Sequence, residues 1–392
     1  MSCEKPFTIS IPDAQLALLH QKLALATFPD ELSDAGWDHG VPLSDIRRLA
    51  ARWSDSAQFD WRVQEAKLNA ELPQFTRDID VEGHGTLNIH YIHKRSAVEG
   101  AIPLLFLHGW PGCFLESRKV AALATQGSAE FPAFNLVALS HPGFGFSEGP
   151  KTKGFAVEKY AEVAHKLMLP LGYDEYVIQG GDFGHLVSYN IAKIYGVKHC
   201  IGAPPAGDAN PLTPAEGARL AKNGEFFATG MGYVHIQSTR PQTLGYSLAD
   251  SPVGLLAWIY EKLAQWSDGY PWTDDEVLTW ISIYWFSRAG PTASIRSYRE
   301  GMKGNINSLF EAMVKEPIQS IPMGISHFPN DSIVMPKSWT RCLGNIVFDG
   351  VHESGGHFAA YERSEELVGD LRKMFGKSGP AFGVVSGKSG YA

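Results

Sequence analysis

The chain has 392 residues, of which 44% are hydrophobic and 19% are charged, and its formal net charge at pH 7 is −8. A typical single domain has roughly 150 residues, so we expect one large domain with additions, or two domains, around a sizeable core. The hydrophobic fraction is too high for an intrinsically disordered chain, and the negative charge without a Lys/Arg cluster argues against nucleic acid or an acidic membrane surface as a partner.

The cysteines and the first residues of the chain bear on its compartment. The four cysteines are Cys3, Cys113, Cys200 and Cys342, and no two of them have CxxC spacing, so neither a zinc site nor a disulfide framework is predicted. Scattered cysteines of this kind are best explained by a reducing compartment. Residues 1–10 contain no apolar run, and the longest apolar stretches elsewhere are far short of the ~18 residues that span a membrane. We therefore expect no signal peptide, no membrane anchor and a cytoplasmic protein.

Residues 1–77 are predicted to form a helical N-terminal extension. Apolar residues recur at helical spacing in residues 14–25 and 43–53, and no strand pattern is evident in this part of the chain.

From residue 78 onward, apolar runs bounded by Gly and Pro alternate with helical patterns. This order predicts an α/β core with a mostly parallel central sheet in residues 78–205 and 319–376. The expected strands are residues 87–93, 104–108, 134–140, 176–179, 199–203, 323–327 and 345–348. The expected helices of the core are residues 159–169, 186–195 and 364–374.

Two segments depart from this alternation. Residues 206–318 carry helical patterns at 220–227, 255–265, 280–285 and 306–313, which predict a helical insertion that serves as a lid, or cap. Residues 377–392 are rich in Gly and Ser and have no periodicity, so a flexible tail is predicted.

The strongest local signal is Gly180-Gly181-Asp182-Phe183-Gly184, between an expected strand and an expected helix. Its spacing is that of a nucleophile elbow, in which a strained turn lifts one side chain above the sheet and small neighbours prevent clashes. A carboxylate at the centre is already ionised at pH 7 and can attack a carbon electrophile to form an ester. The alternative is a turn in which Asp182 only caps the next helix, and the turn alone does not decide between the two.

The second signal is His108-Gly109-Trp110-Pro111-Gly112, directly after another expected strand. In α/β-hydrolases the loop at this place supplies one backbone N–H to the oxyanion hole, and the residue after the nucleophile supplies the other. We therefore predict the backbone amides of Trp110 and Phe183 as the two donors, against the alternative of an ordinary Gly/Pro turn.

A base and its orienting acid are expected later in the chain. His357 follows the last expected strand and precedes the final helix, which is where this fold places its base. Asp331 follows the penultimate strand and is the predicted acid, while surface roles are expected for Asp349 and Glu353. His185 flanks the elbow, and its role stays open.

On these motifs the chain resembles the epoxide hydrolases of the α/β-hydrolase superfamily, and specifically the microsomal-type branch with its soluble fungal and bacterial members. The resemblance extends over almost the whole chain, from the block at residues 6–9 to the block at residues 356–360, and it includes the segments 232–233 and 236–241.

The resemblance also implies two residues that the patterns alone do not single out. In the family two lid tyrosines hold the epoxide oxygen, and Tyr233 and Tyr298 match them. A neutral phenol can donate a hydrogen bond or a proton to the alkoxide that forms when the ring opens.

The function implied by the resemblance is hydrolysis of an epoxide to a vicinal diol through an alkyl ester on Asp182. The resemblance implies neither a cofactor nor a metal. The glycines at 143–145 lack the remainder of a dinucleotide fingerprint, so NAD is not expected either. The expected partner is a small-molecule epoxide, in detoxification, aromatic hydrocarbon catabolism or biosynthesis, and a homodimer is also predicted. A haloalkane dehalogenase-like hydrolase and a non-catalytic ligand-binding homologue are the alternatives, although the tyrosine pair disfavours the first.

Overall fold

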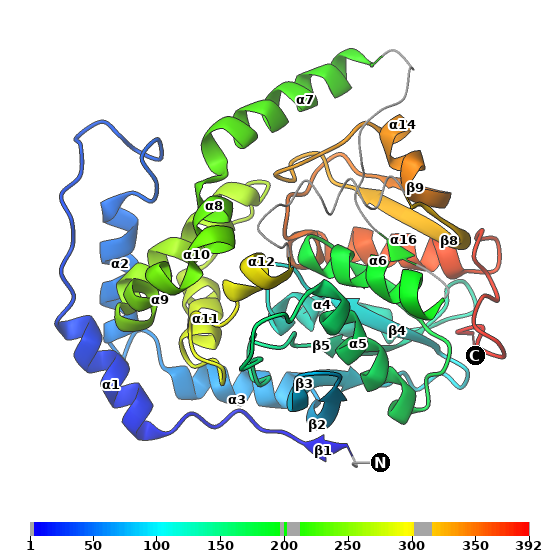
Figure 1. The fold of residues 1–392 in the computed structure, drawn as a ribbon, viewed down its shortest axis with the longest axis horizontal. Coiled ribbons are helices and arrows are strands. Elements are labelled where there is room, and N and C mark those ends of the chain that lie inside the picture. The colour runs from blue at the N-terminus through cyan, green and yellow to red at the C-terminus, as the bar shows by residue number, and fades with distance from the viewer. Residues whose placement is uncertain (1–3, 197–199, 202–211, 302–315, 392) are drawn as a thin grey trace.

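The computed structural model describes residues 4–196, 200–201, 212–301 and 316–391, and its strands form two sheets (Figure 1). The first sheet has the order β1-β2-β3-β5-β4-β6. Its strands are β1 (Lys5–Pro6), β2 (Gln74–Val81), β3 (Gly85–Lys94), β4 (Ile102–Leu107), β5 (Phe134–Leu139) and β6 (Val177–Gly180). The second sheet has the order β7-β8-β9 and comprises β7 (Cys200–Ile201), β8 (Ile318–His327) and β9 (Gly344–Val351).

Strand pairing is parallel at the centre and antiparallel at one edge. β4 pairs in parallel with β5 and β6, and β8 pairs in parallel with β7 and β9. The pairs β1–β2, β2–β3 and β3–β5 are antiparallel. All six residues of β4 are buried, as expected for a parallel strand covered on both faces. The predicted α/β-hydrolase fold with a mostly parallel sheet is thus confirmed.

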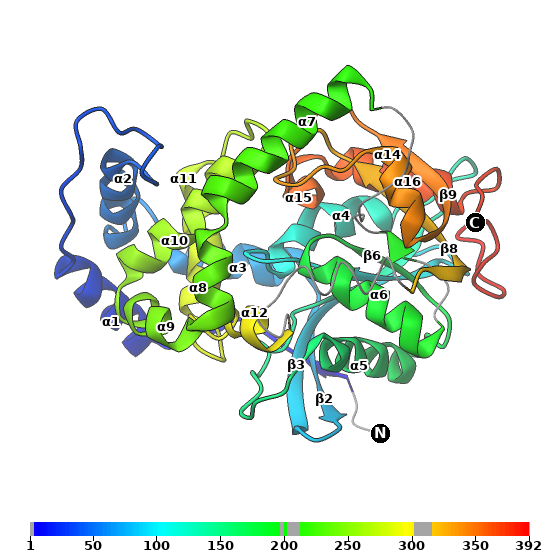
Figure 2. The same ribbon diagram turned by 45° about the horizontal axis from the view of Figure 1, so that its top comes forward.

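Helices cover both faces of the sheet (Figure 2). On one face α5 (Val157–Met168) packs beside α6 (Phe183–Tyr195), and on the other α4 (Ser117–Ala124) packs beside α16 (Ser364–Phe375). Short helices complete this part of the chain: η1 (Phe114–Glu116), η2 (Leu169–Leu171), α14 (Lys337–Thr340), η4 (Arg341–Leu343) and α15 (Ala359–Glu362). The three helices predicted for the core, at 159–169, 186–195 and 364–374, correspond to α5, α6 and α16.

The N-terminal segment contains α1 (Asp13–Ala24), α2 (Leu43–Ser54) and α3 (Trp61–Glu71), but it is not purely helical. β1 and the first residues of β2 lie within it and extend the central sheet, so the expectation that it holds no strand is wrong. The strand was missed because β2 buries polar side chains, among them Gln74, Thr76 and Arg77, and therefore lacks a clear apolar pattern.

The next described segment after β7, residues 212–301, is mainly helical. It comprises α7 (Pro214–Glu225), the π-helical turn η3 (Phe226–Gly230), α8 (Gly232–Thr239), α9 (Pro241–Asp250), α10 (Pro252–Trp266), α11 (Asp274–Trp285) and α12 (Arg296–Gly301). Capping boxes start α7 and α11, with Thr213 paired to Glu216 and Thr273 paired to Glu276. The helix predicted at 306–313 and most of the strand predicted at 199–203 lie outside the described residues.

Ion pairs join the N-terminal helices to this helical segment, beside which they lie in Figure 1. Arg52 of α2 lies 2.9 Å from Asp275 of α11, and Lys22 of α1 lies 2.6 Å from Asp250 of α9. Arg48 of α2 also pairs with Asp274. Because these pairs are partly exposed, each contributes at most about 1 kcal/mol.

The C-terminal segment differs from the predicted flexible tail. Ala381 and Val385 are buried, and the backbone N–H of Gly390 donates to Gly100 O at 3.0 Å while its carbonyl accepts from Ala133 N at 2.7 Å. Gly390 has a φ of +77°, and a Cβ at this residue would lie 2.6 Å from Pro132 Cβ. Here the glycines permit close packing on the core instead of mobility.

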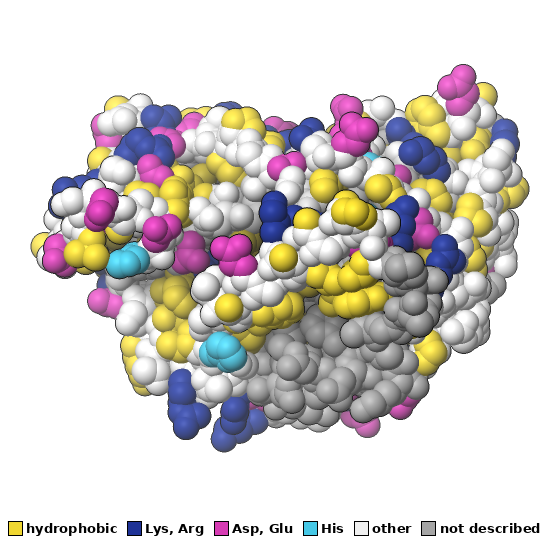
Figure 3. All heavy atoms as spheres, turned by 90° about the horizontal axis from the view of Figure 1, so that it is seen from above, with side chains coloured by type: hydrophobic (Ala, Val, Ile, Leu, Met, Phe, Trp, Pro, Cys, Tyr) yellow, Lys and Arg dark blue, Asp and Glu magenta, His cyan; other side chains and the backbone are white. Residues whose placement is uncertain are grey.

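The charges on the surface and the lengths of the helices are relevant to binding of nucleic acids and membranes. On the face shown in Figure 3, Lys, Arg, Asp and Glu side chains are interspersed. Within residues 4–196, 212–301 and 316–391, no helix is long and apolar enough to cross a bilayer.

Candidate active site

Asp182 stands in a sharp turn between β6, which ends at Gly180, and α6, which starts at Phe183. Its backbone angles are φ 51° and ψ −127°, and no other non-glycine residue in the described ranges has a positive φ. Such a conformation costs of order 1–3 kcal/mol and persists only when surrounding contacts enforce it. The turn therefore has the strain expected of a nucleophile elbow.

Glycines on both sides of Asp182 allow the turn to pack closely. A Cβ on Gly184 would lie 2.1 Å from Leu107 O, and a Cβ on Gly180 would lie 2.7 Å from both Gly184 O and Ser188 Oγ. In contrast, a Cβ on Gly181 would meet nothing within 4 Å. The small residues at 180 and 184 are thus required by contact, whereas the one at 181 is not.

The Asp182 carboxylate faces the loop that follows β4. Its Oδ1 accepts a hydrogen bond from the backbone N–H of Trp110 at 2.8 Å. Residue 109 must be a glycine at this contact, because a Cβ at this residue would lie 2.6 Å from the Asp182 Cβ. The predicted oxyanion donor at Trp110 is thus directed at the carboxylate whose ester would carry the developing negative charge.

Helix α11 fixes the loop that carries this amide. Trp280 Nε1 donates to Pro111 O at 2.8 Å, and Tyr284 Oη donates to Gly112 O at 2.6 Å. The Trp110–Pro111 peptide bond is cis, and the Trp110 side chain is buried. The donor is consequently held by contacts made before any substrate binds, as electrostatic preorganisation requires.

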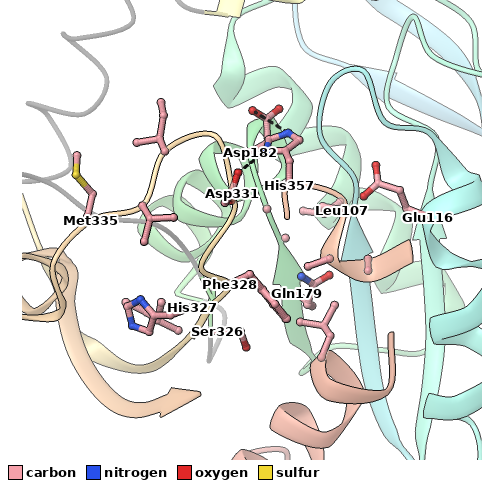
Figure 4. A pocket seen from close by; sticks show the side chains of 18 of the residues that line it. Leu107, Glu116, Gln179, Asp182, Ser326, His327, Phe328, Asp331, Met335 and His357 are labelled. Atoms are coloured by element: carbon pink, nitrogen blue, oxygen red, sulfur yellow. Dashed lines mark hydrogen bonds and ion pairs between the residues drawn. The ribbon is translucent and has the colours of Figure 1, made fainter. Parts of the chain in front are cut away.

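His357 and Asp331 come from the loops after β9 and β8 and meet at the elbow (Figure 4). His357 Nδ1 lies 2.8 Å from Asp331 Oδ1, and His357 Nε2 lies 3.9 Å from Asp182 Oδ2. Ser332 N donates to Asp331 Oδ1 at 2.7 Å, and His357 N donates to Trp266 O at 2.8 Å. The predicted nucleophile, base and acid are therefore brought together in the order of contact that their roles demand.

The other acidic candidates lie elsewhere. Asp349 Oδ1 is 3.1 Å from His327 Nε2, and Glu353 is exposed. His185 is buried on the first turn of α6, where its ring is part of the packing next to the elbow.

The charges of the site shift the pKa values of its members. Burial acts to lower the pKa of His357, but the charge and hydrogen bond of Asp331, with the charge of Asp182, outweigh burial and raise the pKa to about 9. Burial acts in the opposite sense on Asp331, yet the His357 partner and the Ser332 hydrogen bonds lower its pKa. His357 is accordingly protonated at pH 7.

Tyr233 of α8 and Tyr298 of α12 lie together above the same loop. Tyr233 stacks on Trp110 with ring centroids 5.3 Å apart, and Tyr298 meets Trp110 edge-on at 5.4 Å. The two hydroxyls share a hydrogen bond. Burial and then nearby negative charge, including that of Asp182, raise the pKa of each phenol, so both are neutral donors at pH 7.

Phe183 is the first residue of α6 and directly follows Asp182. Its ring packs edge-on against Tyr160 at 4.9 Å and against His141 at 5.6 Å. These contacts anchor the first turn of the helix, where a backbone amide has no partner within the helix.

The sequence reading missed Glu116, which ends η1. Glu116, Asp182, Asp331 and His357 line one cavity of about 130 Å³ together with apolar residues from β4, β8 and α15 (Figure 4). The only sequence signal is its place four residues after Gly112, and a Glu there reads equally well as an exposed helix residue. No group of three His, Cys, Asp or Glu side chains suited to a metal ion occurs in the part of the chain that the structure describes.

Gly184→Ala tests the close packing of the elbow. The new methyl would overlap the Leu107 carbonyl, so we expect unfolding to become easier by about 1–3 kcal/mol and diol formation to fall sharply. Denaturant unfolding and the initial rate with an epoxide measure the two effects. Gly181→Ala is the matched control and should change the unfolding free energy by no more than about 0.5 kcal/mol; equal destabilisation by the two variants would contradict this account of the turn.

Comparison with families supports this geometry from an independent direction. Residues 4–117 match the family described as epoxide hydrolase N terminus, and residues 102–201 match the alpha/beta hydrolase fold.

Individual proteins match over most of their length. Epoxide hydrolase 1 of Sus scrofa is 33% identical over 413 aligned residues, which cover 95% of this chain and 88% of the relative. The structure of Aspergillus niger epoxide hydrolase is 37% identical with a TM-score of 0.83, and the alignment covers 94% of this chain and 95% of that one. The juvenile hormone epoxide hydrolase structure from Bombyx mori is 26% identical with a TM-score of 0.82, covering 95% and 93%.

Proposed function

The chain belongs to the epoxide hydrolase family, and from this premise we propose that it converts an epoxide to a vicinal diol through a covalent ester on Asp182. The observation that carries the covalent route is the strained turn that directs the Asp182 carboxylate at the Trp110 amide and at His357. Direct attack of water on the epoxide would not need a carboxylate at an elbow.

In the first step an oxygen of Asp182 attacks an epoxide carbon. The carbon–oxygen bond of the ring breaks, an ester bond forms, and the epoxide oxygen takes a proton from the Tyr233–Tyr298 pair. Asp182 loses its negative charge in this step. The negative charge of Asp182 helps to raise the pKa of His357, so the loss of this charge lowers that pKa. His357 can then give its proton to the tyrosinate.

In the second step neutral His357 accepts a proton from water, and the hydroxide adds to the ester carbonyl. The backbone amides of Trp110 and Phe183 are the proposed donors to the tetrahedral oxyanion. The intermediate then collapses to the diol and Asp182, and the acid proton passes to the diol oxygen. The cycle ends with Asp182 charged, His357 protonated and both tyrosines neutral, as it began.

The aromatic walls of the site favour an apolar, aryl-substituted epoxide. Trp110, Tyr233, Tyr298 and Trp266 form a continuous set of ring contacts with centroid distances from 5.2 to 6.4 Å. Roles in detoxification or aromatic hydrocarbon catabolism follow from such a substrate. A panel of aryl and aliphatic epoxides, scored by diol formation and enantiomer ratio, tests this assignment; a clear preference for small aliphatic epoxides would contradict it.

Residues 206–318 are proposed as the lid, 1–77 as the extension, and 78–205 with 319–376 as the hydrolase core. The contacts of α10 and α11 with the loops that carry His357 and Trp110 support this division. A cytoplasmic location is supported by Cys113, a buried free thiol. The homodimer stays a prediction for sedimentation measurements.

Two alternatives have distinct outcomes. A haloalkane dehalogenase-like hydrolase would release halide from chloroalkanes, and the tyrosine pair disfavours it because an alkoxide, not a halide, needs a proton. A non-catalytic homologue would bind epoxides without releasing diol.

His357→Gln should allow ester formation and block ester hydrolysis. General-base catalysis typically contributes 10²–10⁴ in rate, so the second step should slow by about that factor while the first changes little. Intact-protein mass spectrometry should then show a mass increase equal to that of the epoxide. The Asp182→Ala protein is the control and should show no adduct; steady turnover by His357→Gln without an adduct would exclude His357 as the base.

The tyrosine pair should be partly redundant. Tyr233→Phe or Tyr298→Phe leaves one donor for the alkoxide and should lower the rate of ester formation by at most about 10²–10³, the usual cost of one oxyanion donor. The double variant should form no detectable ester. Stopped-flow measurement of the first step checks the series, and a double variant as fast as the wild type would refute the assignment.

A further inference from the structure

Glu116 is a buried carboxyl group in the active-site cavity that the two steps described above do not use. It is 8% exposed, and it lines the cavity that Asp182 and His357 also line. Buried carboxyl groups are rare without a partner or a role, because water solvates the ionised form far better than a protein interior does.

Glycines in the loop after β4 make room for this side chain beside the nucleophile. A Cβ on Gly112 would lie 1.8 Å from Glu116 Oε1, so any larger residue at 112 would displace the carboxyl group. Backbone hydrogen bonds from Gly109 and Cys113 hold the carboxyl. A Cβ on Gly109 would lie 2.6 Å from the Asp182 Cβ, so the backbone of this one glycine touches both acids.

The protonation state of Glu116 suits a neutral polar contact. Burial, and to a smaller degree the charge of Asp182, raise its pKa to about 8 against the opposing effects of His357 and the backbone hydrogen bonds. At pH 7 the group is therefore a neutral acid, which has one O–H donor and an acceptor carbonyl and does not repel Asp182.

The distance between His357 and Asp182 indicates the step in which Glu116 could make a hydrogen bond. His357 Nε2 lies 3.9 Å from Asp182 Oδ2, which is beyond hydrogen-bond distance. A water that attacks the Asp182 ester gives one proton to His357 Nε2, and its second O–H needs an acceptor in the same cavity. Asp331 does not serve, because it binds His357 at Nδ1, on the other side of the imidazole ring from the water at Nε2.

We propose that Glu116 holds the hydrolytic water, by accepting its second O–H while His357 accepts the first. This inference rests on the covalent mechanism proposed above and adds a positioning residue to its second step. Glu116 plays no part in ester formation, since neither the epoxide oxygen nor the attacking carboxylate needs an acceptor there. The contacts of Trp280 and Tyr284 with the same loop keep the carboxyl group in place.

Single-turnover kinetics of Glu116→Leu and Glu116→Gln test the proposal. Leu keeps a similar volume without a polar atom, and Gln keeps the acceptor oxygen without the ability to ionise. In Glu116→Leu we expect ester hydrolysis to slow by about 10²-fold, a cost typical of a misplaced reactant, while ester formation stays within about threefold of wild type. In Glu116→Gln both steps should stay within about tenfold, so the acceptor rescues hydrolysis.

Ser117→Ala is the matched control, because it removes a neighbouring buried polar group that bonds to Phe114 O at 2.7 Å at the same helix start. It should leave the ratio of the two rates unchanged. The proposal is overturned if Glu116→Leu slows both steps equally or neither, or if Glu116→Gln hydrolyses the ester as slowly as Glu116→Leu.

Two measurements distinguish a failure of this inference from unfolding of the variant and from a failure of the covalent mechanism. Circular dichroism and thermal unfolding show whether Glu116→Leu is folded; if it is not, the shape-preserving Gln variant decides, and a loss of hydrolysis beyond about tenfold there overturns the proposal. If the wild type forms no ester at all, the covalent mechanism has failed. Normal ester formation without a selective effect at Glu116 contradicts only this inference.

Discussion

The left-handed backbone of Asp182 is the constraint on which the site depends. The conformation is unfavourable for a residue with a side chain, and it is retained because β4, β6 and α6 meet at the turn without room for any atom beyond hydrogen at Gly184. That packing raises one carboxylate out of the sheet and brings it against the Trp110 amide. Stability of the core is thus coupled to the position of the nucleophile.

Around the turn, the site is a set of charges whose balance changes during the reaction. Asp182 and Asp331 flank His357, and their combined charge raises its pKa to about 9 despite burial. Ester formation removes one of the two charges, so the same imidazole that is protonated in the resting protein becomes a base for water. Glu116, kept neutral by burial, adds a hydrogen-bonding group without adding a third charge.

Much of this arrangement could be predicted from residue patterns, where local chemistry determined the structure. The elbow at 180–184, the loop at 108–112 and the strands β3 to β6 were recognisable because glycines mark the turns and apolar runs mark buried parallel strands. The pairing of His357 with Asp331 followed from their places after consecutive strands.

Other features depend on packing between distant parts of the chain. β2 buries polar residues that find partners only in the folded sheet, and residues 377–392 pack on the core through contacts to Gly100 and Ala133. Glu116 is the clearest case, because its burial is decided by a glycine four positions earlier and by the elbow 66 residues later. Tyr233 and Tyr298 were identified by family resemblance alone, since their meeting at Trp110 requires the α8 and α12 arrangement.

The source of the oxygen atom that enters the diol is the most direct test of the central claim, the ester on Asp182. In a single turnover in H₂¹⁸O with excess enzyme, attack of water on the ester carbonyl leaves the diol unlabelled and places ¹⁸O in the peptide that contains Asp182. Peptide and product mass spectrometry measure both. A diol labelled in the first turnover, with an unlabelled Asp182 peptide, would contradict the covalent mechanism and assign Asp182 and His357 to activation of water.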